Sequence, residues 1–271
     1  MLFFPQDDFD LTRIAESGQC FRWEPLEDGG YRIPFRNSCL HIRDTENGKF
    51  ELDCSVEEFQ ALWRDYFDLD TDYSGIRARV DKLQDPFLYC AAQAEQGIRI
   101  LRQDPWETLV SFIISQNRNI PAIRRSIDLL CRAAGEARED RRGERYYAFP
   151  SPEGILKLGD AALDACRLGY RAKYVRAAAQ RAAEGLFSAE SLLETPEAET
   201  ISALTELYGV GIKVASCVSL FGLHHLDAFP VDVWIRRVLE AEYPGGYPYE
   251  LYSPYNGVYQ QYMFAYCRKQ R

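Results

Sequence analysis

Short segments in which apolar and polar residues alternate occupy the first third of the chain. The stretches Asp28-Gly-Gly30 and Glu46-Asn-Gly48 separate them and indicate turns. Alternation with a period of two is typical of strands with one buried face, so the pattern predicts an antiparallel sheet. Ser55-Val-Glu-Glu58 then resembles a capping box and predicts a helix through about residue 66. The predicted strands cover residues 19–23, 31–35, 39–43 and 49–52.

From about residue 84 onward the apolar residues recur at helical spacing. Asp104-Pro-Trp-Glu107 predicts a helix start, because aspartate favours the N-cap and proline favours the first helical position. The apolar run at 108–114 makes this helix a buried, central one. The charged segment 135–145 is predicted to be a loop. Further helices are predicted at residues 121–134, 153–158, 160–166, 171–185, 188–193, 197–208, 212–222, 232–241 and 255–269.

These patterns predict an α+β fold with two parts. An N-terminal antiparallel sheet domain with a flanking helix is predicted at residues 1–83, and an all-helical domain at 84–271. The length of 271 residues and the 46% hydrophobic content suffice to bury a sizeable core. No apolar run reaches the roughly 18 residues of a membrane span, and the first residues lack the basic region of a signal peptide.

The eight cysteines are scattered, and none of them forms a Cys-x-x-Cys pair. Without a secretory signal a disulfide framework is not expected, and the spacing disfavours a zinc site or an iron–sulfur cluster. We therefore expect a reduced, cytoplasmic protein.

The net charge of −9 argues at first sight against a nucleic-acid partner. The excess lies entirely in the first third, where residues 1–85 carry 19 acidic and 10 basic side chains, while residues 86–271 carry 22 of each. A balanced region can still gather a local basic patch, and backbone amides bind phosphate without contributing net charge. The charge therefore leaves DNA open as a partner of the helical part.

One segment near the C-terminal third predicts a helix–hairpin–helix at about residues 204–222. In Leu204-Thr-Glu-Leu-Tyr-Gly-Val-Gly-Ile-Lys-Val-Ala215, Gly209 and Gly211 permit a tight turn, and the small Ala215 lets the two helices pack closely. Such a hairpin directs backbone N–H groups outward, where they can bind a phosphate. A hairpin with a purely structural role is the alternative.

Lys213 follows the hairpin directly, and Asp232 lies further along in Pro230-Val-Asp232. A lysine on a helix is usually solvated surface, but beside a held polymer its amine can attack a sugar carbon and form a Schiff base. The amine must first lose its proton, through burial, nearby positive charge or a partner. Asp232 is that candidate partner and also a predicted N-cap, which would fix its carboxylate for electrostatic stabilisation.

At this point the motifs resemble the helix–hairpin–helix GPD DNA glycosylase superfamily, and the lysine resembles its bifunctional members. Further motifs are similar to those of the 8-oxoguanine DNA glycosylase/AP lyases, in a compact bacterial version, and they follow in the same order over nearly the whole chain. These motifs are Ser17-Gly-Gln-Cys-Phe-Arg-Trp23, Asp104-Pro-x-Glu107 with Ser111-Phe-Ile-x-Ser-x-Asn117, Leu168-Gly-Tyr-Arg-Ala-Lys-Tyr-Val175 and Pro254-Tyr-x-Gly-x-x-Gln260-x-x-x-Phe264.

The resemblance implies a pocket for a base flipped out of duplex DNA. Phe264 and Cys217 would hold the base between them, and the Gln260 amide would read its Watson–Crick edge. The Gly18 carbonyl would accept from the N7–H that 8-oxoguanine has and guanine lacks. For Phe264 and Cys217 ordinary core packing is the alternative, and for Gly18 a glycine in a strand turn.

The resemblance also implies three contacts in the gap left in the duplex. Asn117 would fill the space of the extruded base, Tyr170 would wedge the opposite strand, and Arg171 would contact the orphaned base, with a solvated helix start as the alternative for the last two. Two departures stand out. Ala122 replaces a second arginine that reads cytosine, which predicts relaxed selectivity, and Trp234 replaces a phosphate-contacting histidine.

These implications predict a bifunctional glycosylase that excises 8-oxoguanine from double-stranded DNA and then cleaves the strand. We expect a monomer at the bacterial nucleoid with no organic cofactor or catalytic metal, although the hairpin carbonyls could hold a structural monovalent or calcium ion. Two alternatives remain open, a helix–hairpin–helix glycosylase for another damaged base and a non-catalytic hairpin module that only grips DNA.

Overall fold

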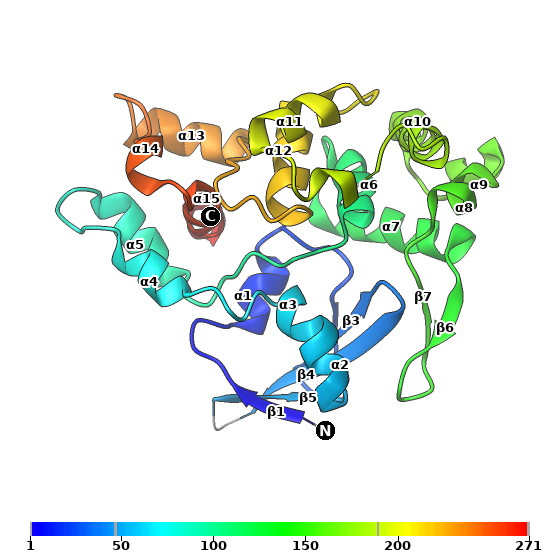
Figure 1. Ribbon diagram of the computed structural model, residues 1–271, viewed down its shortest axis with the longest axis horizontal. Coiled ribbons are helices and arrows are strands. Elements are labelled where there is room, and N and C mark those ends of the chain that lie inside the picture. Colours follow the sequence, from blue (N-terminus) through cyan, green and yellow to red (C-terminus); the bar gives the residue numbers. More distant parts are fainter. Residues whose placement is uncertain (1, 46–47, 189, 270–271) are drawn as a thin grey trace.

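The computed structural model describes residues 2–45, 48–188 and 190–269. Figure 1 shows an antiparallel sheet on one side of the molecule and a larger assembly of helices on the other. The sheet has five strands in the order β1-β5-β4-β3-β2. The α+β fold class is therefore confirmed. The strands are β1 (Leu2–Pro5), β2 (Glu24–Pro25), β3 (Tyr31–Phe35), β4 (Ser38–Thr45) and β5 (Lys49–Leu52).

The strand predicted at 19–23 is wrong. The segment is irregular, and the strand begins only at Glu24. Its alternation has another cause, because Cys20 and Trp23 belong to the core around the sheet whereas Phe21 belongs to the core of the helices. The strand at Leu2–Pro5 was not predicted. At the predicted 46–48 turn, Gly48 has φ +65°, and residues 46 and 47 lie outside the described part of the chain.

Helices cover one face of the sheet and fill the space beside it. α1 (Leu11–Glu16) was not predicted, whereas the helix predicted from Ser55 is present as α2 (Val56–Glu58), η1 (Phe59–Trp63) and α3 (Arg64–Tyr66). The Ser55 side chain caps it by accepting from the Glu58 amide. Aromatic side chains of these helices, among them Trp63 and Tyr66, pack against the sheet and are buried.

The second part is helical throughout except for one hairpin of two strands. α6 starts at the predicted Asp104 cap and is almost completely buried, so the prediction of a central helix is confirmed. The elements are α4 (Tyr73–Ala78), α5 (Pro86–Ala94), α6 (Pro105–Ser115), α7 (Ile120–Ala134), α8 (Pro152–Leu156), α9 (Asp160–Ala165), η2 (Gly169–Arg171), α10 (Ala172–Ala183), η3 (Glu190–Leu192), α11 (Glu197–Thr205), α12 (Ile212–Phe221), α13 (Val233–Glu242), α14 (Tyr249–Tyr252) and α15 (Asn256–Lys269).

The segment predicted as a loop at 135–145 instead contains most of an antiparallel hairpin, β6 (Ala137–Glu139) and β7 (Arg145–Tyr147). The Asp140 carboxylate fixes its turn by accepting from the amides of Arg142 and Glu144. Asp140 also lies 3.3 Å from His41 Nε2 on β4, so the hairpin is tied to the sheet. The helix predicted at 188–193 is reduced to the single turn η3, and residue 189 is not described.

Two buried clusters form the core, one around the sheet and one among the helices. Tyr73, Ile76 and Val80 pack in the helical cluster although they precede residue 84. The domain boundary between 83 and 84 stays a prediction. In Figure 1, α15 lies between α13 and α5, which brings the C-terminal helix against the first residues of the helical part. Among the described helices, none combines the length and apolar character needed to cross a membrane.

Candidate active site

The predicted hairpin joins α11 to α12. Gly209 has φ +83°, and a Cβ atom there would lie 2.2 Å from the Tyr174 ring, so only glycine fits. Gly211 is the N-cap of α12, is exposed, and makes no side-chain cap. The first backbone N–H groups of α12 therefore face a position where an anion can bind. The Gly209 carbonyl accepts from Gln116 Nε2 at 3.1 Å, which fastens the hairpin to the end of α6.

A cavity of about 450 Å³ opens beside the start of α12. It brings together four of the predicted site residues from distant parts of the chain. Lys213 comes from α12 and Asp232 from the start of α13, while Gly18 follows α1 and Phe264 belongs to α15. The other lining residues are Phe21, Phe112, Ser115, Arg118, Asn119, Ile120, Pro121, Ile123, Trp234 and Arg268.

Lys213 lies in the first turn of α12 and is partly buried. Its Nζ atom is 5.1 Å from the centre of the Phe112 ring, and its side chain is near enough to the Cys217 thiol one turn later to lower the pKa of that thiol. An aromatic face and a thiol therefore hold the amine at the wall of the cavity rather than in bulk solvent.

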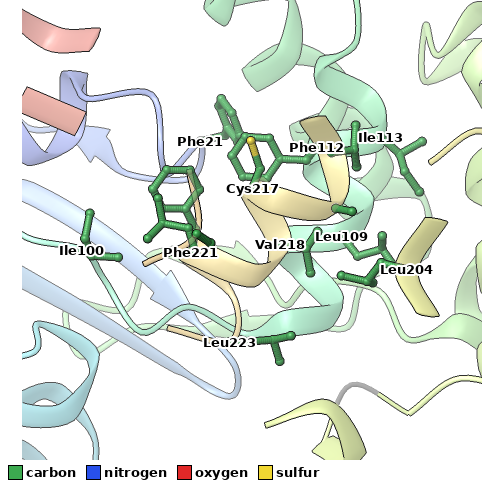
Figure 2. Close-up of a cluster of buried hydrophobic side chains, with 14 of the residues drawn as sticks. Phe21, Ile100, Leu109, Phe112, Ile113, Leu204, Cys217, Val218, Phe221 and Leu223 are labelled. Atoms are coloured by element: carbon green, nitrogen blue, oxygen red, sulfur yellow. The ribbon is translucent and has the colours of Figure 1, made fainter. Parts of the chain in front are cut away.

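Cys217 lies beneath Lys213 and is buried. Figure 2 shows its sulfur beside the rings of Phe21 and Phe112, in the same cluster where Phe112 stacks on Phe221. Burial raises the pKa of the thiol, although the charge and hydrogen bond of Lys213 act in the opposite direction, and the Asp232 charge raises it further. The thiol is thus neutral at pH 7, and it is close enough to interact with both Lys213 and Asp232.

Asp232 is the N-cap of α13, as its position in the sequence predicts. Its Oδ1 atom accepts from the amides of Trp234 and Ile235, both at 2.9 Å. Capping fixes the carboxylate, and the residue lines the same cavity as Lys213. A fixed negative charge at the cavity wall can stabilise a positive charge that develops on a bound molecule.

Gly18 and Phe264 form another part of the wall. Gly18 has φ +80°, and a Cβ atom there would lie 3.2 Å from Cε1 of Phe264. Arg268, one turn later on α15, donates to the Glu16 carbonyl at 3.0 Å, with its guanidinium carbon 5.8 Å from the centre of the Phe264 ring. The C-terminal helix and the residues after α1 therefore fix each other at this point.

Two predicted pocket residues do not line the cavity. Gln260 is buried, its Nε2 donates to the Pro230 carbonyl at 3.0 Å, and its Oε1 accepts from Gln261 at 3.0 Å. Cys217 is covered by the side chains above it.

The three residues predicted at the DNA gap lie together beside the cavity. Asn117 is exposed, has φ +51°, and donates from Nδ2 to the Tyr170 hydroxyl at 3.2 Å. Tyr170 is also exposed. Arg171, in contrast, is buried and donates to the carbonyls of Gln116 and Leu168. Its donors therefore hold the backbone that carries Asn117.

Of the two departures, Trp234 lines the cavity and Ala122 does not. Ala122 is in the first turn of α7, where its amide donates to Asn119 Oδ1 at 3.0 Å. Trp234 lines the cavity, and the Arg237 guanidinium carbon is 5.6 Å from the centre of its ring. An indole at this position offers a stacking face and one N–H donor in place of a cation.

Phe112, Arg118 and Arg268 also line the cavity, although no sequence motif predicted a role for them. Phe112 was assigned to a buried helix, and its proximity to Lys213 depends on how α6 packs against α12. Arg118 lies in the polar run that follows α6, and this run was the only available signal.

The part of the chain that the structure describes contains one grouping with metal-ligand spacing, made of His41, Asp140 and Glu144. None of the three lines the cavity. Arg32 Nη1 lies 2.9 Å from Glu144 Oε2 and 3.6 Å from Asp140 Oδ2, so a guanidinium already supplies the positive charge there.

Comparison with known proteins identifies the class of protein to which this chain belongs. Residues 110–244 match the family described as HhH-GPD superfamily base excision DNA repair protein, and residues 1–109 match the 8-oxoguanine DNA glycosylase N-terminal domain. The chain belongs to the 8-oxoguanine DNA glycosylase family within that superfamily. The predicted family is thus confirmed.

Relatives of known sequence or structure agree with this family. An N-glycosylase/DNA lyase of Saccharomyces cerevisiae is 32% identical, over 86% of this chain and 68% of its own length. The 8-oxoguanine glycosylase/lyase of Clostridium acetobutylicum, solved with double-stranded DNA containing cytosine opposite 8-oxoguanine, is 33% identical with a TM-score of 0.89, covering 97% of this chain and 93% of that one. The structure of MBOgg1 with a low-affinity DNA ligand is 38% identical with a TM-score of 0.91, covering 98% and 94%.

Proposed function

We propose that this protein is a bifunctional DNA repair enzyme, a DNA N-glycosylase that excises 8-oxoguanine from double-stranded DNA and an AP lyase that then cuts the strand. The family match over both parts of the chain and the N-glycosylase/DNA lyase relatives support this function. The observation that assigns this function to particular residues is that the Lys213 amine and the capped Asp232 carboxylate line the same cavity.

Lys213 is the nucleophile in this proposal. Its deprotonated amine attacks C1′ of the lesion nucleotide, the C1′–N9 bond breaks, and its electron pair leaves with the base, which takes up a proton. The C1′–O4′ bond of the sugar then opens, which gives a Schiff base between Lys213 and C1′ and a free hydroxyl at C4′. Asp232 stabilises the positive charge on the sugar as the base leaves. Phe112 and Cys217 orient the amine by the contacts described above.

Strand cleavage follows from the same imine. A proton leaves C2′, the C3′–O bond breaks, and the phosphate on O3′ departs with the electron pair of that bond. Hydrolysis of the remaining imine returns Lys213. Each step uses protons and water that the solvent supplies, so no cofactor or catalytic metal enters the proposal.

The lesion would enter the cavity beside Gly18 and Phe264, which lie against each other at the cavity wall. The Gly18 carbonyl would accept from N7–H of 8-oxoguanine and repel the bare N7 of guanine, and Phe264 would stack on the base from α15. In the same proposal Cys217 supports the base from the opposite side. Gln260 would bond its Watson–Crick edge after exchanging the present hydrogen bond with the Pro230 carbonyl.

DNA binding would involve the neighbouring surface. Backbone N–H groups at Gly209 and Gly211 would hold a phosphate at the N-terminus of α12. Asn117 and Tyr170 would occupy the gap in the duplex, and Arg171 would position them from below. An ion at the hairpin carbonyls, a monomeric state and a location in the bacterial cytoplasm or nucleoid are further parts of the proposal.

Borohydride trapping on a panel of damaged duplexes tests the function. The wild-type protein should crosslink to 8-oxoguanine duplexes faster than to duplexes with thymine glycol or an alkylpurine. Lys213→Gln should bind the same duplex without crosslinking, and the matched control Lys157→Gln, on an exposed lysine at the end of α8, should crosslink normally. Chelation with EDTA should leave trapping unchanged.

Other outcomes favour the alternatives. Faster trapping on thymine glycol or an alkylpurine would indicate a glycosylase for another base. Tight DNA binding with no trapped complex on any lesion would indicate a non-catalytic DNA-binding module.

A further inference from the structure

Arg118 is a cation that lines the cavity but has no role in the proposed reaction. It lies between α6 and Asn119, the N-cap of α7, and lines the cavity together with Lys213 and Asp232. A positive charge directly before a helix N-terminus opposes the helix dipole, which is an unfavourable place for it. A function at this position would explain why a residue that destabilises the helix start is present.

The guanidinium is held in place but keeps free donors. Nη1 donates to Ser126 Oγ at 2.5 Å, and Nη2 donates to the Arg167 carbonyl. An arginine carries five N–H donors, so these two anchors leave the others for a ligand. Because two hydrogen bonds already fix the planar guanidinium, binding a ligand costs less side-chain entropy.

Arg118 belongs to the group of residues at the proposed DNA gap. Burial lowers its pKa, the nearby charge of Arg171 lowers it further, and Tyr170 acts in the opposite direction. Arg118 also directly follows Asn117, whose side chain donates to the Tyr170 hydroxyl at 3.2 Å. In the proposed complex, the base opposite an extruded lesion would lie unpaired beside these residues.

Arg171, the arginine that the family resemblance assigns to that base, is engaged elsewhere. It is 5% exposed. Its Nε donates to the Gln116 carbonyl at 2.7 Å, its Nη1 to the Leu168 carbonyl at 3.3 Å, and its plane lies against Tyr170, with the guanidinium carbon 4.3 Å from the ring centre. Of these two arginines, Arg118 is the one that lines the cavity and has donors left.

We propose that Arg118 reads the base opposite the lesion and favours cytosine, an inference that rests on the proposed glycosylase function. A cytosine without its partner presents two adjacent acceptors, N3 and O2, which match the parallel donors of a guanidinium. Thymine and guanine present an N–H donor at the central position, and adenine presents a single acceptor flanked by an amino group. A positively charged fork with only donors therefore prefers cytosine over the other three bases.

This assignment reverses the expectation drawn from Ala122. The methyl group at residue 122 cannot reach a base, but the cation at residue 118 approaches the same gap from the segment just before α7. Selectivity for cytosine is then kept by a different residue, and relaxed selectivity is not expected.

The test measures single-turnover excision of 8-oxoguanine opposite cytosine, adenine, guanine and thymine. Wild type should prefer cytosine, and Arg118→Lys and Arg118→Gln should each reduce the cytosine-to-adenine rate ratio about tenfold, the loss expected for one bidentate base contact. Arg118→Lys keeps the charge without the fork, so its affinity for undamaged duplex should stay near wild type. Arg132→Gln, at the far end of α7, is the matched control and should keep the wild-type ratio.

A rescue variant separates base reading from a structural role. Adding Ala122→Arg to Arg118→Gln should restore the cytosine preference without restoring the tie to Arg167. Equal wild-type rates opposite all four bases, or a ratio unchanged in both Arg118 variants, would overturn the inference. So would an equal loss on all four duplexes with a lowered Tm, because that result indicates that Arg118 only anchors α7. Excision from no duplex at all would instead contradict the proposed function itself.

Discussion

Lys213 and Asp232 line the cavity from the starts of two successive helices, whereas Gly18 and Phe264 line it from opposite ends of the chain. We call the first pair the rim and the second pair the wall. The rim is placed by local features, a glycine hairpin before α12 and an aspartate cap on α13. The wall exists only because α15 packs beside the residues that follow α1. Mutations of the rim and mutations of the wall should therefore have separable effects on activity.

The largest effect is expected at the rim. Asp232→Asn keeps an N-cap side chain but removes the charge, so we expect single-turnover excision to fall by about 100- to 1000-fold with little change in Tm. Asp232→Ala should lose the same activity and also about 1 kcal/mol of stability, because the amides of Trp234 and Ile235 lose their acceptor. Excision kinetics and thermal unfolding of both variants check this. Near-normal excision by Asp232→Asn would remove the carboxylate from the mechanism.

The hairpin before α12 contains two glycines, Gly209 and Gly211, that can be compared by the same substitution. A Cβ atom at Gly209 would strike the Tyr174 ring at φ +83°, whereas at Gly211 it would meet nothing within 4 Å. Gly209→Ala should therefore cost about 2–4 kcal/mol of unfolding free energy, while Gly211→Ala should cost far less. Denaturant unfolding measures both variants. Equal losses would show that the hairpin is not held by its contact with α10.

Gly18→Ala tests the wall without touching the rim. The new methyl group would press on Phe264 at 3.2 Å from a left-handed backbone position, so the Phe264 ring should be displaced. We expect excision of 8-oxoguanine to fall about tenfold, an effect of the size of one lost base contact. Trapping on a duplex with a preformed abasic site should stay near wild type. A parallel loss on both substrates would mean that rim and wall are not separable.

The smallest effect concerns a link between the sheet and helical parts. Asp68 is buried, and its carboxylate lies 3.1 Å from His224 Nε2 and 3.2 Å from Arg102 Nε. Burial alone would raise the pKa of this carboxyl, but the hydrogen bond and charge of His224, with the charge of Arg102, lower it overall. The folded state therefore binds this proton less readily than the unfolded state does. The resulting stability is present at neutral pH and is lost as the pH falls through the lowered pKa.

Asp68→Asn should accordingly reduce the unfolding free energy by about 1–2 kcal/mol at pH 7. The difference from wild type should shrink as the pH falls through the lowered pKa of Asp68, where the wild-type carboxyl also takes up its proton. Urea unfolding at a series of pH values measures this difference. A difference that stays constant over the series would show that the ion pairs of Asp68 contribute nothing to stability.

The contrast between rim and wall also explains what the sequence could and could not predict. Lys213 and Asp232 follow from neighbours a few residues away, and both lie where the motif places them. β1 pairs with β5, and no local pattern announces a partner so distant in the chain. The alternation at 19–23 was misleading because consecutive side chains there enter two different cores. The burial of Arg171 and of Gln260 depends on carbonyls from other segments, which no periodicity reveals.

The central claim is that Lys213 carries the Schiff base. Borohydride reduction of the complex with an 8-oxoguanine duplex, followed by digestion and mass spectrometry, identifies the residue that is joined to the sugar. We predict a single adduct on the peptide that contains Lys213, and none when that residue is glutamine. An adduct on another lysine, such as Lys173 beside the rings of Tyr174 and Tyr208, or undiminished crosslinking by Lys213→Gln, would contradict this assignment.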